Sequence, residues 1–209
     1  MSLAPLGLVL LVGQAASLGD SVRPKAPPGL SWEDAEHVAE TVARLERRLK
    51  AGKPASRQPI AVSERQINSY VTLTLAPTLP PALSGLRVHF EPGKLAANGM
   101  LDLDAVRARL PTSGPSSLLS FLSGTVPVAL KGRFQGASGL GKVEVEEAVV
   151  AGISLPPALL SQIVAQATRT AKQPQGFDLL APFPLPWTAR SVRLEAGRAV
   201  VEFAQEPGR

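Results

Sequence analysis

The sequence predicts an α+β fold, with a strongly twisted antiparallel sheet of about six strands, arranged as three hairpins, packed on two or three helices. Three observations support this fold class. Apolar residues recur at helical spacing in segments that start near residues 31, 63 and 157. They alternate with polar residues in paired segments between residues 85 and 203, and glycine or proline separates the segments. We assign residues 56–205 to a single domain.

The start of the chain is predicted to be an export signal. Residues 1–17 are apolar, but a proline and a glutamine interrupt a run that is already short for a membrane span. Ala15 and Ser17 are small residues suited to cleavage after Ser17. The chain has no cysteine, which excludes a lipoprotein. Residues 18–30 read as a linker rich in proline and glycine, so we expect an exported protein of the periplasm or cell envelope.

Residues 31–55 are predicted to form an N-terminal amphipathic helix. Ser31 suits the N-cap, and Gly52 and Pro54 end the helix. Its apolar stripe consists of Ala35, Val38, Val42, Leu45 and Leu49. Basic residues gather near its end, namely Arg44, Arg47, Arg48 and Lys50. The first three could contact an anionic membrane surface; alternatively, the cluster complements the helix dipole.

Two further helices follow from capping and spacing. Ile60 and Val62 indicate a short strand before the first of them, and Ser63 with Gln66 forms a capping box. The inward residues of this helix are Ile67, Tyr70, Val71 and Leu75. The second helix follows residue 153, with prolines at its start. Its inward stripe comprises Leu159, Leu160, Ile163, Val164 and Ala167.

The hairpins are predicted from period-two alternation. Leu86, Val88 and Phe90 mark one arm of the first hairpin. The second alternates through Val126, Val128 and Leu130, and returns through Val143, Val145 and Val149. Residues 191–203 form the third. The segments VHFEPGK (88–94) and VRLEAGR (192–198) resemble each other, through shared turn chemistry or through an internal duplication.

A G-x-x-x-x-G-K sequence runs from Gly136 to Lys142 and invites comparison with a phosphate-binding loop. Such a loop opens a helix and places Ser or Thr after the lysine. Here Val143 occupies that position, and the residues that follow alternate as in a strand. We therefore expect a hairpin turn in which the glycines supply positive φ angles.

Catalytic and metal-binding patterns are sparse. Asp102 and Asp104, two apart on a predicted strand, could hold a hard cation, but a solvated strand face is the preferred interpretation; the same holds for Glu144 and Glu146. The two histidines, His37 and His89, have no nucleophile at a recognisable spacing. Nine aromatic residues give little support for nucleic-acid binding. We expect no enzyme activity, no cofactor and no metal.

The stretch VSERQINSY, residues 62–70, resembles the opening of small bacterial periplasmic proteins with a tubular lipid-binding (TULIP-like) fold. In that pattern Ser63 and Gln66 cap a helix, Ile67 and Tyr70 face inward, and Asn68 is polar. The resemblance covers residues 57–203 and implies a groove between sheet and helices that accepts acyl chains. The chain departs from those proteins in lacking a lipid-attachment cysteine and in having the helix at 31–51.

These patterns favour an exported, non-enzymatic protein that binds a lipid or other apolar ligand. The candidate ligand-binding residues are Ile67, Tyr70, Val71, Leu75, Leu159, Leu160, Ile163, Val164, Phe183 and Trp187. Phe183 and Trp187 lie on a proline-rich loop that either forms a lip of the groove or caps the core. The alternative is a structural or protein-interaction module of the envelope with a solid core, because apolar stripes also build ordinary packed cores.

Overall fold

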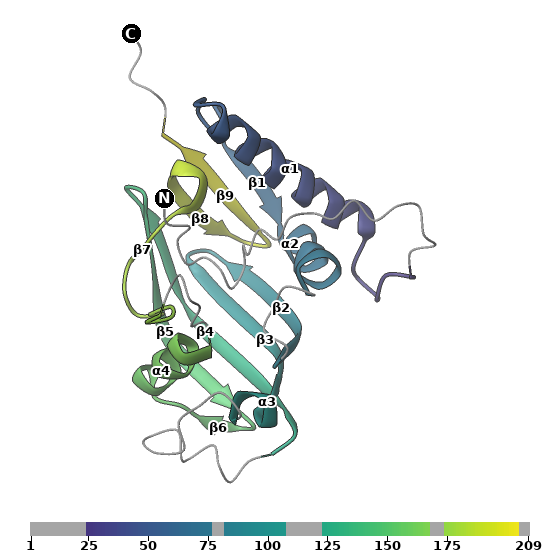
Figure 1. Ribbon diagram of the computed structural model, residues 1–209, viewed down its shortest axis with the longest axis vertical. Coiled ribbons are helices and arrows are strands. Elements are labelled where there is room, and N and C mark those ends of the chain that lie inside the picture. Colours follow the sequence, from purple (N-terminus) through teal and green to yellow (C-terminus); the bar gives the residue numbers. More distant parts are fainter. Residues whose placement is uncertain (1–23, 77–81, 108–122, 168–173, 205–209) are drawn as a thin grey trace.

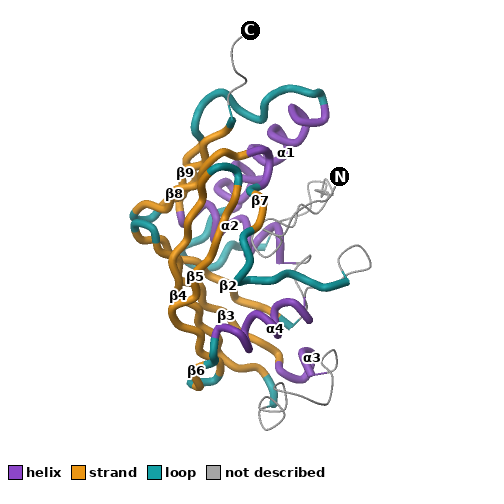
Figure 2. The backbone as a smooth tube through the Cα atoms, turned by 90° about the vertical axis from the view of Figure 1, so that its left-hand side faces the viewer, coloured by secondary structure: helices purple, strands orange, loops and turns teal. Residues whose placement is uncertain are grey.

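A computed structural model describes residues 24–76, 82–107, 123–167 and 174–204. It confirms an α+β fold with an antiparallel sheet, and the helices lie on one side of that sheet (Figures 1 and 2). The α-helices are α1 (Trp32–Lys50), α2 (Glu64–Tyr70), α3 (Leu103–Arg107) and α4 (Pro157–Ala167). α2 continues as the π-helical segment η1 (Val71–Leu75), and a 3-10 helix, η4, spans Pro186–Thr188. The predicted signal peptide, residues 1–17, lies outside the described residues.

Within the described residues the sheet has nine strands, so the expected number of six is too low. They are β1 (Ile60–Ser63), β2 (Leu83–Glu91), β3 (Lys94–Asp102), β4 (Thr125–Ala137), β5 (Leu140–Val150), β6 (Ile153–Ser154), β7 (Phe183–Pro184), β8 (Ala189–Glu195) and β9 (Arg198–Phe203). The three predicted hairpins are β2–β3, β4–β5 and β8–β9. The additional strands are β1, which Ile60 and Val62 indicated, and the two-residue strands β6 and β7.

Strand β4 pairs with both of the other hairpins, β2–β3 and β8–β9. β3 pairs with β4 from Lys94 opposite Arg133 to Asp102 opposite Thr125, and β8 meets β4 farther along, at Gly136. The hairpin tips join directly, because Gly93 N–H donates to Leu194 O and Gly197 N–H donates to Phe90 O, both at 3.0 Å. The two similar segments, 88–94 and 192–198, form these two meeting tips, where the chain uses the same turn chemistry twice.

A bulge in β5 changes which residues face the helices. The pairing with β4 passes from Lys131–Glu147 to Gly132–Val145, so one residue of β5 is extra. Because a strand alternates with period two, the extra residue shifts the inward positions by one. Val143 and Val145 pack inward before the bulge, and Ala148 and Val150 after it. The prediction that Val149 continues the alternation of Val143 and Val145 is therefore wrong.

The glycine-rich segment is a turn, as expected, but its motif glycines do not make the turn. Ser138 and Gly139 have φ angles of 53° and 80°, the left-handed conformations of a two-residue hairpin. Gly136 and Gly141 lie opposite each other within β4 and β5. A Cβ atom on Gly136 would lie 2.7 Å from Val192 O, so its role is close packing rather than positive φ.

Helix α2 attaches to the open edge of β2 through side chains. Asn68 Nδ2 donates to Val88 O at 2.8 Å, and Val88 N–H donates to Asn68 Oδ1 at 2.7 Å. Phe90 N–H donates to a Glu64 carboxylate oxygen at 3.0 Å. These bonds replace a neighbouring strand and cover an edge that would otherwise be free to pair with another chain. The predicted capping box of Ser63 and Gln66 fixes the start of the helix.

Helix α1 is tied to α2 and lies beside β1 (Figure 1). Arg65 Nε lies 3.1 Å from Asp34 Oδ2, and Ser31 N–H donates to Ser69 Oγ at 3.1 Å. Ser31 is the N-cap of α1, as predicted.

The predicted strand position of Asp104 is wrong, because Asp102 ends β3 and its carboxylate accepts from the backbone at the start of α3.

A candidate apolar ligand pocket with a basic groove beside it

A pocket of about 160 Å³ lies between the sheet and helices α1 and α2. Its lining is apolar apart from Thr41, the phenol of Tyr70 and the indole of Trp187. The lining residues are Val38, Thr41, Val42, Leu45, Ile60, Val62, Ile67, Tyr70, Val88, Phe90, Leu95, Phe134, Pro186, Trp187, Val192, Leu194, Ala199, Val201 and Phe203. We call this space the apolar pocket.

Secondary-structure periodicity explains how the lining forms. Val38, Val42 and Leu45 follow each other at helical spacing on α1, so they share the face that is turned to the sheet. On the strands, residues two apart share a face, which places Val201 and Phe203 of β9 in the wall. The pocket is thus lined by the inner stripe of α1 and the inner face of the sheet.

The polar atoms of the lining are held in neutral or hydrogen-bonded states. Arg44 Nη2 donates to Thr41 Oγ1 at 3.4 Å. Burial, and secondarily the charge of Glu46, raises the pKa of the Tyr70 phenol, which therefore stays neutral at physiological pH. No carboxylate or histidine is among the residues that line the pocket. This chemistry suits an apolar ligand and offers no acid–base pair.

The structure divides the predicted ligand-binding residues between two regions. Ile67, Tyr70 and Trp187 line the apolar pocket. Val71 and Leu75 are buried beside it and pack with Val38 and Leu86.

The stripe on α4 lies elsewhere, because α4 covers another part of the sheet, well away from α1 (Figure 1). Leu159 packs on Leu103 and Val150, and Leu160 joins the same cluster. Val164 packs against the cluster that contains Phe177, while the side chain of Ile163 lies outside the described residues. The two helical stripes therefore do not face each other across one groove.

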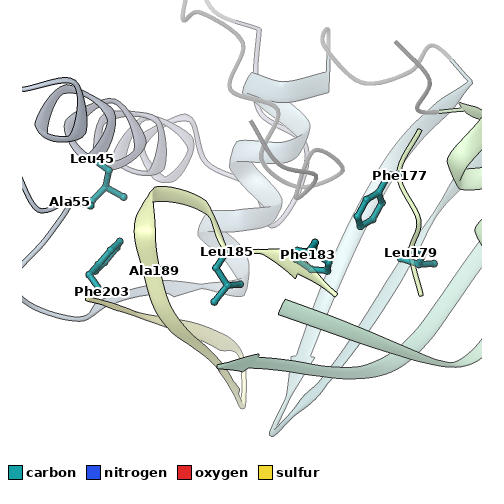
Figure 3. Close-up of a cluster of buried hydrophobic side chains, with 8 residues drawn as sticks. All are labelled: Leu45, Ala55, Phe177, Leu179, Phe183, Leu185, Ala189 and Phe203. Carbon is teal, nitrogen blue, oxygen red and sulfur yellow. The ribbon is translucent and has the colours of Figure 1, made fainter. Parts of the chain in front are cut away.

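The two aromatic residues of the proline-rich loop, Phe183 and Trp187, occupy different environments. Phe183 is 4% exposed and packs edge-to-face on Phe177, with ring centroids 5.6 Å apart (Figure 3). Phe183 therefore belongs to the core and is not a lip. Trp187 is half-buried, has a left-handed φ of 52° and contributes to the wall of the apolar pocket.

A second, wider hollow adjoins the apolar pocket at the end of α1. It has a volume of about 830 Å³, and its lining comprises Arg44, Leu45, Arg48, Lys53, Pro54, Ala55, Ser56, Arg57, Gln58, Pro59 and Ile60. We call it the basic groove, because four of these residues are cationic and none is acidic. Leu45 and Ile60 line both hollows. Arg44 and Arg48 belong to the basic cluster predicted near the end of the helix, whereas Lys53 and Arg57 were not predicted, and the loop after α1 brings them to the same hollow.

The remaining candidates are structural. His89 Nδ1 lies 2.8 Å from Glu64, the residue that also accepts from β2. Glu144 pairs with Lys142 and Glu146 with Arg133. Within the described parts of the chain, no three His, Asp or Glu side chains gather as metal ligands.

None of the described helices is both long and apolar enough to cross a membrane. Comparison with family models, curated proteins and solved structures gives no match to this chain.

Proposed function

We propose that this protein is an exported, non-enzymatic binder of a lipid or other apolar ligand at the cell envelope. The observation that carries the proposal is the apolar pocket, a space of about 160 Å³ with an almost wholly apolar wall. Dry cavities of roughly this size, about 150 Å³, bind molecules such as benzene. The TULIP-like resemblance of residues 62–70 supports the same function, and export rests on the apolar run at residues 1–17.

The size of the pocket also defines the rival function. A benzene-sized space holds about six carbon atoms, which is one short chain segment rather than a whole diacyl lipid. In addition, Leu159 and Leu160 of the α4 stripe pack in a buried cluster with Leu103 and Val150. Both facts favour the alternative, a structural or protein-interaction module of the envelope. The experiment must therefore distinguish a usable cavity from a small packing defect.

A larger side chain in the pocket wall distinguishes a usable cavity from a packing defect. Val62, on β1, is half-buried and lines the pocket. In a usable cavity, Val62→Phe occupies free space and leaves the free energy of unfolding within about 1 kcal/mol of the wild type; in a packed core, overpacking costs about 1–3 kcal/mol. The matched control is Val149→Phe, at a half-buried β5 position outside the pocket. Urea unfolding measures both variants.

Binding is measured by calorimetry with unbranched alcohols from butanol to dodecanol, which carry no charge. Each buried methylene contributes about 0.8 kcal/mol, so affinity should rise about fourfold per carbon until the pocket is full. We expect a plateau near six carbons in the wild type and loss of binding in Val62→Phe. Absence of alcohol binding, together with a destabilised Val62→Phe variant, would refute the proposal and favour the solid-core module.

Contact with an anionic membrane through Arg44, Arg47 and Arg48 stays a prediction. Arg44 and Arg47 are exposed, whereas Arg48 is half-buried and its Nε donates to Pro54 O at 2.8 Å. Arg47 does not line the basic groove. Salt-sensitive binding to anionic vesicles, lost on charge reversal of these residues, would support membrane contact.

A further inference from the structure

The positive charge of this protein is concentrated beside the apolar pocket. Residues 44–58 contain six cationic side chains and one carboxylate, that of Glu46. Their net charge of +5 equals the net charge of the whole chain, so the rest of the chain is neutral on balance. Four of the six cations line the basic groove. The groove is therefore the place where an anion gains most from this charge.

The cations of the groove differ from several cations on the sheet. Lys131, Lys142 and Arg193 each lie within about 3.1 Å of a glutamate oxygen. By contrast, none of the cations in the groove has an ion-pair partner among the described residues. These three sheet cations are thus neutralised by neighbouring glutamates, whereas in the described part of the chain no carboxylate neutralises the charge of the groove.

Complementing the helix dipole does not account for this arrangement. At the end of α1, Gly52 N–H donates to Leu49 O and Lys53 N–H donates to Arg48 O, so the backbone itself satisfies terminal carbonyls. The Lys53 and Arg57 side chains lie beyond the helix, on the loop. A role at the helix end explains cations in the last turn, but not the two that the loop adds.

The groove and the apolar pocket share part of their walls. Leu45 and Ile60 line both. Leu45 and Ala55 are almost fully buried, and Figure 3 shows them beside Phe203, a residue of the pocket wall. Apolar side chains therefore form the boundary between a basic hollow and an apolar one.

We propose that the basic groove binds the anionic headgroup, a phosphate or carboxylate, of a single-chain amphiphile whose tail enters the apolar pocket. This inference rests on the proposed apolar-ligand function and specifies its ligand class. Arg44, Lys53 and Arg57 supply donors for charge-assisted hydrogen bonds to the headgroup oxygens. The pocket volume of about 160 Å³ holds about six carbon atoms, so it takes part of one tail and has no room for a second tail.

The test compares three ligands with the same tail and different headgroups: dodecyl phosphate, dodecanol and dodecyltrimethylammonium. The full chain is titrated with each below its micelle concentration, at low and at high salt. We expect dodecyl phosphate to bind at least about tenfold more tightly than dodecanol, with the difference shrinking in high salt, and the cationic ligand to bind least well.

Two triple variants locate the effect. Arg44→Gln/Lys53→Gln/Arg57→Gln removes three groove cations and retains Arg48, which holds the loop through Pro54 O. The control, Lys131→Gln/Lys142→Gln/Arg193→Gln, removes the same charge from the sheet. We expect the groove variant to weaken dodecyl phosphate binding about tenfold or more and to change dodecanol binding less than twofold. The control should change neither affinity by more than about twofold, because none of its three cations lines the groove or the apolar pocket.

The outcomes separate this inference from the function on which it rests. Equal binding of dodecanol and dodecyl phosphate, with no effect of the groove variant, overturns the headgroup site and leaves the apolar pocket standing. Inorganic phosphate that binds as tightly as dodecyl phosphate shows a free-anion site and also overturns it. The headgroup site is also overturned if the groove variant loses binding to anionic vesicles but keeps its affinity for dodecyl phosphate. In that case the groove cations contact a membrane surface and not the headgroup of a bound ligand. Failure of all three amphiphiles refutes both proposals.

Discussion

The side chain of Asn68 gives the sharpest test of how the helices are held on the sheet. It is 8% exposed, and it both donates to Val88 O at 2.8 Å and accepts from Val88 N–H at 2.7 Å. Val88 is 5% exposed, so water has little access to either backbone group. Asn68→Ala therefore leaves a buried donor and a buried acceptor without partners.

The magnitude follows from those two groups. A buried polar group that loses its partner costs about 1–3 kcal/mol, so two of them should lower the free energy of unfolding by about 3 kcal/mol. For a chain of this length, 1 kcal/mol corresponds to a shift of about 2–4 °C in the melting temperature. We expect Asn68→Ala to melt roughly 6–12 °C below the wild type.

Urea unfolding followed by circular dichroism measures the change. The control is Asn98→Ala, an exposed asparagine of β3, which should shift the free energy of unfolding by less than about 0.5 kcal/mol. A loss below about 1 kcal/mol for Asn68→Ala would refute the edge-attachment argument.

Asn68→Asp adds a test of the hydrogen-bond geometry. An ionised carboxylate accepts from Val88 N–H but cannot donate to Val88 O, whereas the protonated form does both. Burial and the facing carbonyl should raise the folded-state pKa of the new carboxyl above its unfolded value of about 3.9. The variant should therefore be least stable, relative to wild type, above its folded-state pKa, and should recover as the pH falls towards about 4. A penalty that does not change with pH would contradict the assignment.

Two further predictions concern packing and titration. Gly136→Ala places a methyl group 2.7 Å from Val192 O and should lower the free energy of unfolding by about 2 kcal/mol in urea unfolding; a neutral effect would show that β4 and β8 separate easily. The Ser161 hydroxyl donates to Asp178 and lowers the pKa of that carboxyl, so the stability it contributes is present above the unfolded-state pKa and is lost as the pH falls through the folded-state pKa. In Ser161→Ala, an NMR titration should find the pKa of Asp178 higher than in the wild type, and an unchanged pKa would assign the shift to the backbone donors instead.

The parts of the fold that sequence analysis predicted correctly are those set by local interactions. The capping box of Ser63 and Gln66, the N-cap Ser31 and the apolar stripe of α1 each depend on residues a few positions apart. The three hairpins likewise follow from alternation and adjacent turns. These signals are complete within a short window of sequence, so no knowledge of the remaining chain is needed.

The errors arise where distant segments meet. Gly136 has no local reason to be glycine; the reason is the approach of β8, more than fifty residues later. The bulge that moves the inward position from Val149 to Val150 is a property of the pairing with β4, not of β5 alone. The separation of α2 from α4 also depends on sheet topology, because two apolar stripes look alike whether they face one cavity or two cores.

The candidate site was predictable in part for the same reason. The stripe on α2 identified Ile67 and Tyr70, but the sheet wall required the strand order. The basic groove is lined by the last turns of α1 and by the loop that follows. Lys53 and Arg57 could therefore be assigned to a site only when the structure placed them in the same hollow as Arg44. Net charge in a sequence window was the available signal, because residues 44–58 hold all of the chain's excess charge.

The manner in which the helices are attached explains how a hollow can persist beneath them. Asn68 and Glu64 fix α2 to the edge of β2, and Arg65 fixes α1 to α2 through Asp34. These polar ties, together with the packing of Val38 and Val42 against Tyr70 and Val71, hold the helices on the sheet around a space that side chains do not fill. A side chain or a ligand that enters the pocket therefore gains apolar burial without displacing a contact that holds the structure together. The contacts that attach the helices are thus different from the space that a ligand fills. For this reason Asn68→Ala should destabilise the fold, whereas Val62→Phe should abolish ligand binding and leave the fold stable.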